Sequence, residues 1–263
     1  MTKATDAVNE TAEVVRDGLE LHVRIDRPYG DEDRPKHAVL MMHGLLGDSG
    51  YADGNLLQEL ADRFVANDWI VVRFDFNGHG KSEGDFAAAD LYNETEDAIA
   101  VLDYVRGRDD VRDIALLGHS AGAVVAGMLA GMYPDVVRGL AMLSPAASLK
   151  DDAMRGLLLG VSFDPVHVPE TIAVADGRVT IDGKFVRIAR TLPVYEMAAR
   201  FHGPALAIQG DRDTVITEAC AKQYGAAMTR CAVSTYSDLT HAFDGADRDV
   251  AEAEAVQFLL ALD

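Results

Sequence analysis

The chain has 263 residues, 49% of them hydrophobic, which is enough for one large domain with a substantial core. Its formal net charge of −19 argues against binding to nucleic acid or to an anionic membrane, because the chain cannot neutralise their phosphates. The N-terminal residues lack a signal-peptide pattern and no apolar run is long enough to span a membrane, so we expect a cytoplasmic protein in which Cys220 and Cys231 are unpaired thiols.

Strand-type and helix-type segments alternate along the chain. Residues Leu19–Ile25 alternate between apolar and polar, which predicts a half-exposed strand near a sheet edge. Continuous apolar runs that end in Gly, Asp, Ser, Pro or Phe follow at 38–44, 70–76, 114–120, 139–145 and 205–211. Uninterrupted runs of this length are typical of parallel strands that are covered on both faces.

Amphipathic segments with helical periodicity lie between or after these runs, at 55–66, 93–106, 121–132, 218–228 and 250–260. This order predicts an α/β fold, with a mostly parallel twisted sheet, right-handed crossovers and helices on both faces. The chain has no internal repeat and no low-complexity tract, so we expect residues 1–263 to form a single domain.

One segment, at about 148–192, interrupts the alternation. It has no long buried strand, but two Asp-Gly pairs, at 176–177 and 182–183, are flanked by residues that favour strands. Asp-Gly between such residues is a signal for short hairpins. We therefore expect an inserted cap that contains short hairpins.

The stretch GHSAG places Ser120 where the apolar run ending at 120 meets the helical segment that begins at Ala121. In open α/β sheets, ligands bind beyond the carboxyl ends of the strands. A sharp turn at this position exposes the serine hydroxyl, and Gly118 and Gly122 remove Cβ atoms that would clash in it. We interpret Ser120 as a nucleophile.

A serine hydroxyl needs a base, and the chain order in hydrolases of α/β type is serine, acid, histidine. Asp211 and Asp213 follow the apolar run at 205–210; we choose Asp213 and keep Asp211 as the alternative. His241 is the one histidine beyond them. In this arrangement Asp213 orients the imidazole, and His241 takes the proton of Ser120 and later protonates the leaving alcohol.

Backbone N–H groups must stabilise the oxyanion that forms during such a reaction. We assign them to Ala121, directly after the nucleophile, and to Leu45 in the HGLLG stretch, where Gly44 allows close approach. His43 is expected to orient this loop, and His119 to have a structural role. The GKS sequence in FNGHGKSEG does not have the glycine spacing of a phosphate-binding loop. We therefore expect a structural turn there, and neither a cofactor nor a metal ion in the protein.

Several longer stretches follow one another along the chain: HGLLGD, RFDFNGHGKSEGDF, SPAASLK, RIARTLPVYE, GDRDTVI and THAF. Through these stretches the chain resembles, from about residue 37 onward, the bacterial cinnamoyl (feruloyl) esterases of the α/β-hydrolase fold. The resemblance implies the same triad and oxyanion donors. It also places Asp152 where the family has an acid that reaches a phenolic hydroxyl. A family tyrosine would fall at or near Phe185, so this chain lacks that hydroxyl, and Ala121 stands where the family usually has Gln.

These observations favour a serine esterase that acts on hydroxycinnamoyl or other small aromatic or short-chain esters through an acyl-enzyme. A monoacylglycerol lipase or an acyl thioesterase is the alternative on the same fold. A ligand-binding protein without catalytic activity is a further alternative, but the presence of all three triad residues argues against it. The expected partner is a small ester, and a homodimer is left open.

Overall fold

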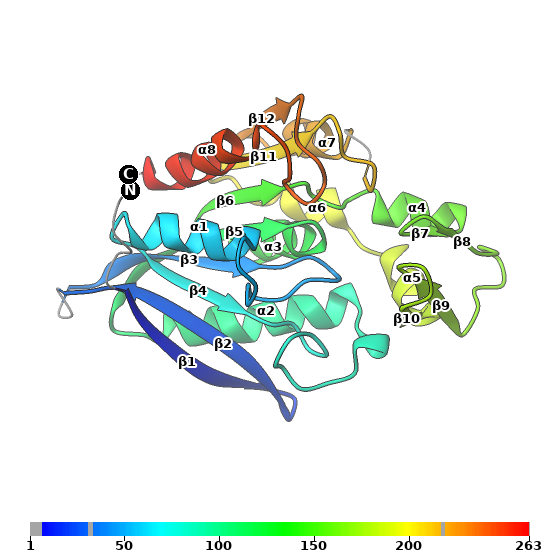
Figure 1. Cartoon of the computed structure of the whole chain (residues 1–263), viewed down its shortest axis with the longest axis horizontal. Helices are drawn as coiled ribbons and strands as arrows, with labels where there is room; N and C mark the ends of the chain where they lie inside the picture. The colour runs from blue at the N-terminus through cyan, green and yellow to red at the C-terminus, as the bar shows by residue number, and fades with distance from the viewer. Residues whose placement is uncertain (1–6, 31–33, 217–218, 263) are drawn as a thin grey trace.

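The computed structural model describes residues 7–30, 34–216 and 219–262. Within these ranges, eight strands form one sheet in the order β1-β2-β4-β3-β5-β6-β11-β12 (Figure 1). The strands are β1 (Ala7–Arg16), β2 (Leu19–Pro28), β3 (Lys36–Met42), β4 (Ile70–Phe74), β5 (Val111–His119), β6 (Val137–Leu143), β11 (Ala205–Gly210) and β12 (Cys231–Tyr236). From β4 to β12 all neighbours pair in parallel, and β1 and β2 pair antiparallel, which confirms the predicted mostly parallel sheet.

Helices cover both faces of this sheet. They are α1 (Leu56–Val65), α2 (Leu91–Arg106), α3 (Ala121–Met132), α6 (Val194–Ala198), α7 (Ala219–Ala227) and α8 (Arg248–Leu260), with a short 3-10 helix η1 (Phe86–Ala88). In β3, Leu40 and Met42 belong to the core that includes α2, α3 and α7, whereas Val39 and Met41 belong to the core under α1 and α8. Successive side chains of a strand point to opposite faces, so a strand buried on both sides is apolar throughout.

Two of the predicted helices, α1 and α2, begin at residues whose side chains cap them. The Asn55 side chain accepts a hydrogen bond from the Leu57 N–H at the start of α1, and Asp90 accepts from the N–H groups of Tyr92 and Asn93 at the start of α2. Such N-caps satisfy backbone donors that have no partner within the helix. The helix predicted at 218–228 is α7, and its first predicted residue lies outside the described ranges.

The segment 148–192, called the cap segment here, lies beyond the carboxyl ends of β5 and β6, at the right of Figure 1. It consists of α4 (Leu149–Arg155), β7 (Leu157–Leu158), β8 (Val161–Ser162), β9 (Thr171–Val174), β10 (Val179–Asp182) and α5 (Gly183–Ala189). Two antiparallel hairpins, β7–β8 and β9–β10, fit the predicted inserted cap.

The two Asp-Gly pairs of the cap segment adopt different local structures. Asp176 and Gly177 form the turn of the β9–β10 hairpin with positive φ angles of 56° and 78°, as predicted. The second pair is not a hairpin turn, because Asp182 precedes helix α5 and Gly183 is its first residue. The Gly183 N–H donates to the Glu170 carbonyl, and an added Cβ at Gly183 would lie 1.9 Å from the Pro169 oxygen. This glycine is needed for close packing rather than for a turn.

Candidate active site

Ser120 occupies a sharp turn between β5 and α3. Its backbone has a positive φ, with φ 57° and ψ −120°, a conformation that costs a non-glycine residue about 1–3 kcal/mol. A Cβ at Gly118 would lie 2.3 Å from the Gly122 oxygen, and one at Gly122 would lie 2.3 Å from the His43 oxygen. Only glycine fits at both positions, which confirms the steric reason given for the GHSAG pattern.

The structure brings the three predicted triad side chains into one hydrogen-bonded chain. His241 Nε2 lies 2.9 Å from Ser120 Oγ, and His241 Nδ1 lies 2.9 Å from Asp213 Oδ2. The other Asp213 oxygen accepts from the N–H groups of Val215 and Ile216, so the carboxylate is fixed in place. Asp213 is 1% exposed as a side chain, whereas the alternative acid, Asp211, is exposed to solvent. The geometry therefore selects Asp213.

Leu45 and Ala121 present backbone N–H groups beside the Ser120 hydroxyl. Among the described residues, neither N–H has a protein acceptor. Gly44 brings the Leu45 loop close, since a Cβ there would lie 3.0 Å from Ser120 Cβ and 3.4 Å from its Oγ. The Ala121 N–H at the start of α3 and the Leu45 N–H in the loop after β3 can together stabilise an oxyanion on an ester carbon attached to Ser120.

His43 orients the peptide unit that carries the Leu45 N–H. Its Nδ1 donates to the Gly44 carbonyl at 2.8 Å, and its Nε2 accepts from the Phe76 N–H at 3.1 Å. Burial, together with the neighbouring His79, lowers the pKa of His43 to about 4, which keeps the ring neutral as this pattern requires. Because the Gly44 carbonyl and the Leu45 N–H belong to one planar peptide, fixing the first directs the second.

Two further histidines brace the site. His79, from the NGHG stretch, has Nε2 at 2.7 Å from the Leu45 carbonyl, so the stretch rejected as a phosphate loop supports the oxyanion loop. His119 Nε2 lies 2.8 Å from the backbone carbonyl of His241. Burial, with a smaller contribution from His241, lowers the pKa of His119 to about 4, so the ring is neutral and donates to that carbonyl. His119 thus has the structural contact expected of it.

Two hollows open at Ser120. The wider one, about 290 Å³, is lined by Gly44, Leu45, Leu46, Gly47, His119, Ser120, Leu159, Val215 and His241. The narrower one, about 40 Å³, is lined by Leu45, Ser120, Ala121, Ala146, Ser148, Leu149, Asp152, Leu159, Val215 and Ile216. The side chains that border both, Leu159 and Val215 among them, show that these are two arms of one cleft; we call them the wide arm and the narrow arm.

The two substrate-contact residues named from the sequence lie in different surroundings. Asp152 lines the narrow arm, with one carboxylate oxygen bonded to Arg155 at 2.6 Å. Phe185 is 1% exposed, packs in the hydrophobic core and borders neither arm. Its ring is one of three buried side chains of α5 in the core, together with Val186 and Ala189, so an apolar residue at this position has a structural explanation.

Sequence reasoning assigned no individual role to several residues that line the cleft, among them Ser148 and Leu159. Ser148 precedes α4, yet its hydroxyl caps no helix N–H, and it is buried without a hydrogen-bond partner beside the narrow arm. Leu159 lies at the tip of the β7–β8 hairpin with a φ of 46° and 38% exposure. The Leu-Gly pair at this tip was the available signal, but leucine is an uncommon residue for a left-handed turn position.

Within the described ranges, no group of three or more His, Cys, Asp or Glu side chains is arranged to hold a metal ion. In the same part of the chain, no helix combines the length and the apolar character needed to cross a membrane.

Comparison with known proteins gives a consistent result. A structure of Est1E from Butyrivibrio proteoclasticus with bound ferulic acid superimposes with a TM-score of 0.89 and 28% identity, covering 95% of this chain and 98% of that one. Human monoglyceride lipase is 30% identical over 130 residues, which are 49% of this chain and 40% of that protein. An uncharacterized protein of Mycobacterium tuberculosis is 27% identical over 175 residues, 64% of this chain and 42% of that protein.

The chain thus spans less than half the length of these curated relatives, whereas it matches the Est1E structure almost completely. These similarities confirm the α/β-hydrolase fold and the resemblance to the cinnamoyl esterases. The profile of the family described as serine aminopeptidase, S33, matches residues 33–170, more than half of the chain. The protein therefore belongs to the serine aminopeptidase S33 family of α/β-hydrolases.

Proposed function

We propose that this protein is a serine carboxylic-ester hydrolase that acts through an acyl-enzyme. The observation that carries the proposal is the chain of two 2.9 Å hydrogen bonds from Ser120 through His241 to Asp213, beside two free backbone N–H groups and an open cleft. Nucleophile, base, orienting acid and oxyanion donors are the four parts that acyl transfer requires.

The reaction follows from this geometry. Ser120 Oγ attacks the ester carbon as its proton passes to His241 Nε2, and the N–H groups of Leu45 and Ala121 stabilise the oxyanion. The carbon–oxygen bond to the alcohol then breaks, and His241 Nε2–H protonates the departing oxygen. Water repeats the sequence: it gives a proton to Nε2, attacks the acyl carbon and releases the carboxylic acid, while the proton returns to Ser120 Oγ. Asp213 stabilises the imidazolium in both halves.

For the acyl group we propose hydroxycinnamoyl or other small aromatic or short-chain groups. Support for a hydroxylated group comes from the ferulic acid bound in Est1E and from two polar groups in the narrow arm, the Asp152 carboxylate and the Ser148 hydroxyl that has no protein partner. The narrow arm, about 40 Å³, is smaller than the roughly 150 Å³ cavity that holds a benzene ring. An aromatic acyl group therefore requires Leu159 or Val215 to move, whereas a short one does not.

A monoacylglycerol lipase or acyl thioesterase is the second candidate. The similarity to human monoglyceride lipase supports it.

Kinetic measurements on a set of esters with different acyl groups distinguish these candidate functions. We would measure kcat/KM for methyl ferulate, methyl caffeate, methyl acetate and a long-chain methyl ester, with Ser120→Ala as the control. Highest values for the two hydroxycinnamates support that acyl class, and highest values for acetate support a short-chain esterase. A preference for the long-chain ester supports the lipase-type alternative. If the wild type hydrolyses none of them faster than Ser120→Ala does, the esterase proposal is wrong.

A further inference from the structure

The position of His241 determines which arm of the cleft receives which half of an ester, on the basis of the proposed function. His241 Nε2 must protonate the departing alcohol oxygen, so the alcohol lies on the His241 side of Ser120. His241 lines the wide arm and is absent from the lining of the narrow arm. Ala121, an oxyanion donor, lines the narrow arm, which leaves that arm for the acyl group.

The lining of the wide arm indicates the chemistry of its occupant. Its side chains are aliphatic except for Ser120 and the two histidines, and no described residue that lines it is Asp, Glu, Lys or Arg. His119 is neutral because burial keeps its pKa near 4. A charged alcohol group would lose its hydration here without gaining an ionic partner, so the arm favours a neutral group.

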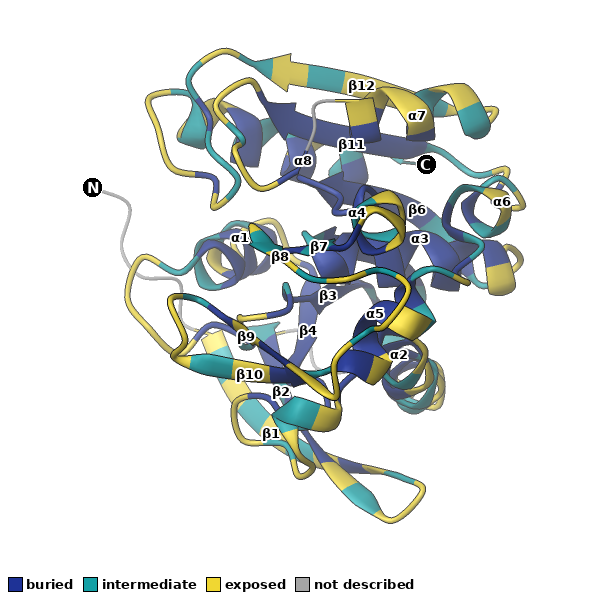
Figure 2. Ribbon diagram, turned by 90° about the vertical axis from the view of Figure 1, so that its right-hand side faces the viewer, coloured by how far each residue is buried: buried dark blue, intermediate teal, exposed yellow. Residues whose placement is uncertain are grey.

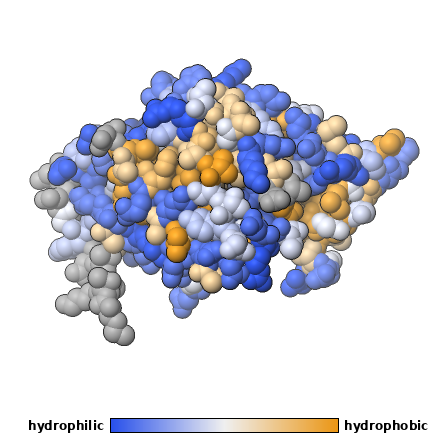
Figure 3. All heavy atoms as spheres, turned by 90° about the horizontal axis from the view of Figure 1, so that it is seen from above, coloured by the Kyte–Doolittle hydropathy of each residue, from blue (hydrophilic) through white to orange (hydrophobic). Residues whose placement is uncertain are grey.

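The volume of the wide arm and the exposure of its aliphatic side chains also favour an apolar alcohol group. A volume of about 290 Å³ is far more than a methyl group fills, and exceeds the roughly 150 Å³ that accommodates a benzene ring. Three aliphatic side chains at its rim are partly exposed: Leu46 (52%), Leu159 (38%) and Val215 (45%). Figure 3 shows apolar surface at the end of the molecule where the cap segment lies, on the right of the view. An apolar alcohol would remove these side chains from water.

We propose that the wide arm binds the alcohol half of the substrate, and that the preferred substrates are esters of neutral, apolar alcohols of about the size of a benzyl group. The acyl group then lies in the narrow arm, between Ala121 and Asp152. Discrimination by size is therefore expected mainly on the alcohol side, and discrimination by polar groups mainly on the acyl side.

A series of esters with one acyl group tests this assignment. We would measure kcat/KM for the methyl, butyl, benzyl and choline esters of the acyl group that the wild type hydrolyses best. Methanol and benzyl alcohol have similar acidities, so a difference between their esters reports binding rather than leaving-group reactivity. We expect a rise of about tenfold or more from methyl to benzyl, as one hydrophobic pocket can supply. We expect the choline ester, with its cationic alcohol, to be hydrolysed less well than the butyl ester.

Two variants, one in each arm, show where the preference arises. Leu46 borders the wide arm alone and Leu149 the narrow arm alone. Leu46→Ser should reduce the benzyl-to-methyl ratio about threefold or more, since part of the apolar contact is lost. Leu149→Ser should change the rates for all these esters by the same factor and keep the ratio. Val250→Ser, at a 59% exposed position on α8, is the control for a polar change at a surface aliphatic residue.

The outcomes separate the two proposals. Equal kcat/KM for methyl and benzyl esters, or a ratio that responds to Leu149→Ser and not to Leu46→Ser, would overturn the assignment of the arms while the esterase function stands. If the wild type hydrolyses no ester of any acyl group faster than Ser120→Ala, the proposed function itself has failed.

Discussion

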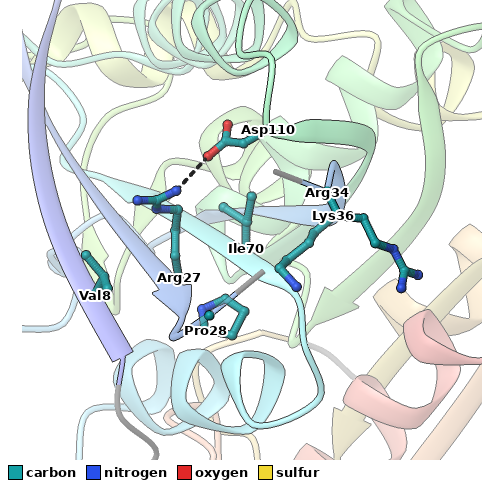
Figure 4. A pocket seen from close by; sticks show the side chains of 8 residues that line it. Val8, Arg27, Pro28, Arg34, Lys36, Ile70 and Asp110 are labelled. Atoms are coloured by element: carbon teal, nitrogen blue, oxygen red, sulfur yellow. Dashed lines mark hydrogen bonds and ion pairs between the residues drawn. The ribbon is translucent and has the colours of Figure 1, made fainter. Parts of the chain in front are cut away.

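Two hollows lie at opposite ends of the parallel strands. One is the cleft above Ser120, at the carboxyl ends. The other, about 10 Å³, lies at the amino ends and is lined by Arg27, Lys36, Ile70 and Asp110 among others (Figure 4). In the second hollow Arg27 pairs with Glu10 at 2.7 Å and with Asp110 at 3.4 Å, and Lys36 pairs with Asp68 at 2.6 Å.

The two hollows differ in whether their polar groups have hydrogen-bond or ion-pair partners within the protein. At the amino ends the Arg27 and Lys36 side chains have carboxylate partners, although Arg27 Nε has none. The cleft above Ser120 leaves the Leu45 and Ala121 N–H groups and the Ser148 hydroxyl without protein partners among the described residues. Buried polar groups are normally hydrogen-bonded, so those left free are available to a ligand. Free polar groups beside an aligned nucleophile, rather than the amount of charge, therefore distinguish the candidate site from the hollow at the amino ends.

The largest effect is expected from removal of the nucleophile. Ser120→Ala should lower kcat by about 10⁵-fold or more, because the acyl-enzyme is no longer formed. Its unfolding temperature should stay close to that of the wild type, since the change deletes one oxygen in an open cleft. Initial rates on the best ester, with a thermal melt of both proteins, measure this. Near-normal turnover by the variant would refute the role of Ser120.

Exchange of the acid tests the choice between the two aspartates of the loop after β11. Asp213→Asn should lower kcat by about 10³- to 10⁴-fold, because His241 loses the carboxylate that holds its tautomer and stabilises the imidazolium. Asp211→Asn is the matched control and should remain within about threefold of the wild type, since Asp211 is exposed. The reverse pattern would mean that Asp211 is the triad acid.

A substitution at Gly122 tests whether its close packing against the end of β3 is needed to position the free N–H groups of Leu45 and Ala121. A Cβ at Gly122 would lie 2.3 Å from the His43 oxygen and 2.5 Å from the Met42 oxygen. Gly122→Ala should therefore cost about 1–3 kcal/mol of stability or more and lower kcat, since β3 leads into the Leu45 loop.

The matched control is Gly107→Ala at the end of α2. There φ is −80° and the nearest atom to an added Cβ is 3.5 Å away. Thermal melts and initial rates of both variants give the comparison. Equal melting temperatures for the two would show that the turn at Ser120 tolerates a side chain at position 122.

The central strands, the main helices and the triad were predictable because each has a local sequence signal. Parallel strands such as β5 are apolar throughout, and the glycines around Ser120 reflect a steric need of the turn itself. The edge strands β1 and β12 were not predicted. Both are exposed on much of their length, as Figure 2 shows, so their sequences lack the continuous apolar run of the centre.

Features that depend on packing between distant segments could not be read from the sequence. Ser148 resembles an ordinary N-cap, and only the fold shows that its hydroxyl has no partner. Gly183 looks like part of a hairpin turn, and only its contact with Pro169 explains it. The sequence offers both Asp211 and Asp213 as the triad acid. Only the fold, which places His241 Nδ1 beside Asp213, decides between them.

The smallest effect is expected at the opposite hollow, where Asp110→Asn should affect stability and not activity. Although partial burial alone raises the pKa of the Asp110 carboxyl, hydrogen bonds and charge from Arg108, with Arg27, outweigh it and hold that pKa below its ordinary value of 3.8. A depressed folded-state pKa stabilises the fold above the ordinary value, and this stability is lost as the pH falls through the folded-state pKa. The ion pairs are partly exposed, so the loss at pH 7 should be about 1 kcal/mol.

Urea unfolding of the wild type and Asp110→Asn at pH 7 and at pH 3 measures this difference, with ester hydrolysis at pH 7 as the second readout. The stability difference should be present at pH 7 and smaller at pH 3, because the Asp110 carboxyl of the unfolded wild-type chain, with its ordinary pKa of 3.8, is mostly protonated there. Hydrolysis should be the same for both proteins. If Asp110→Asn lowers kcat without changing stability, the hollow at the amino ends has a functional connection to Ser120, and the contrast between the two ends of the sheet fails.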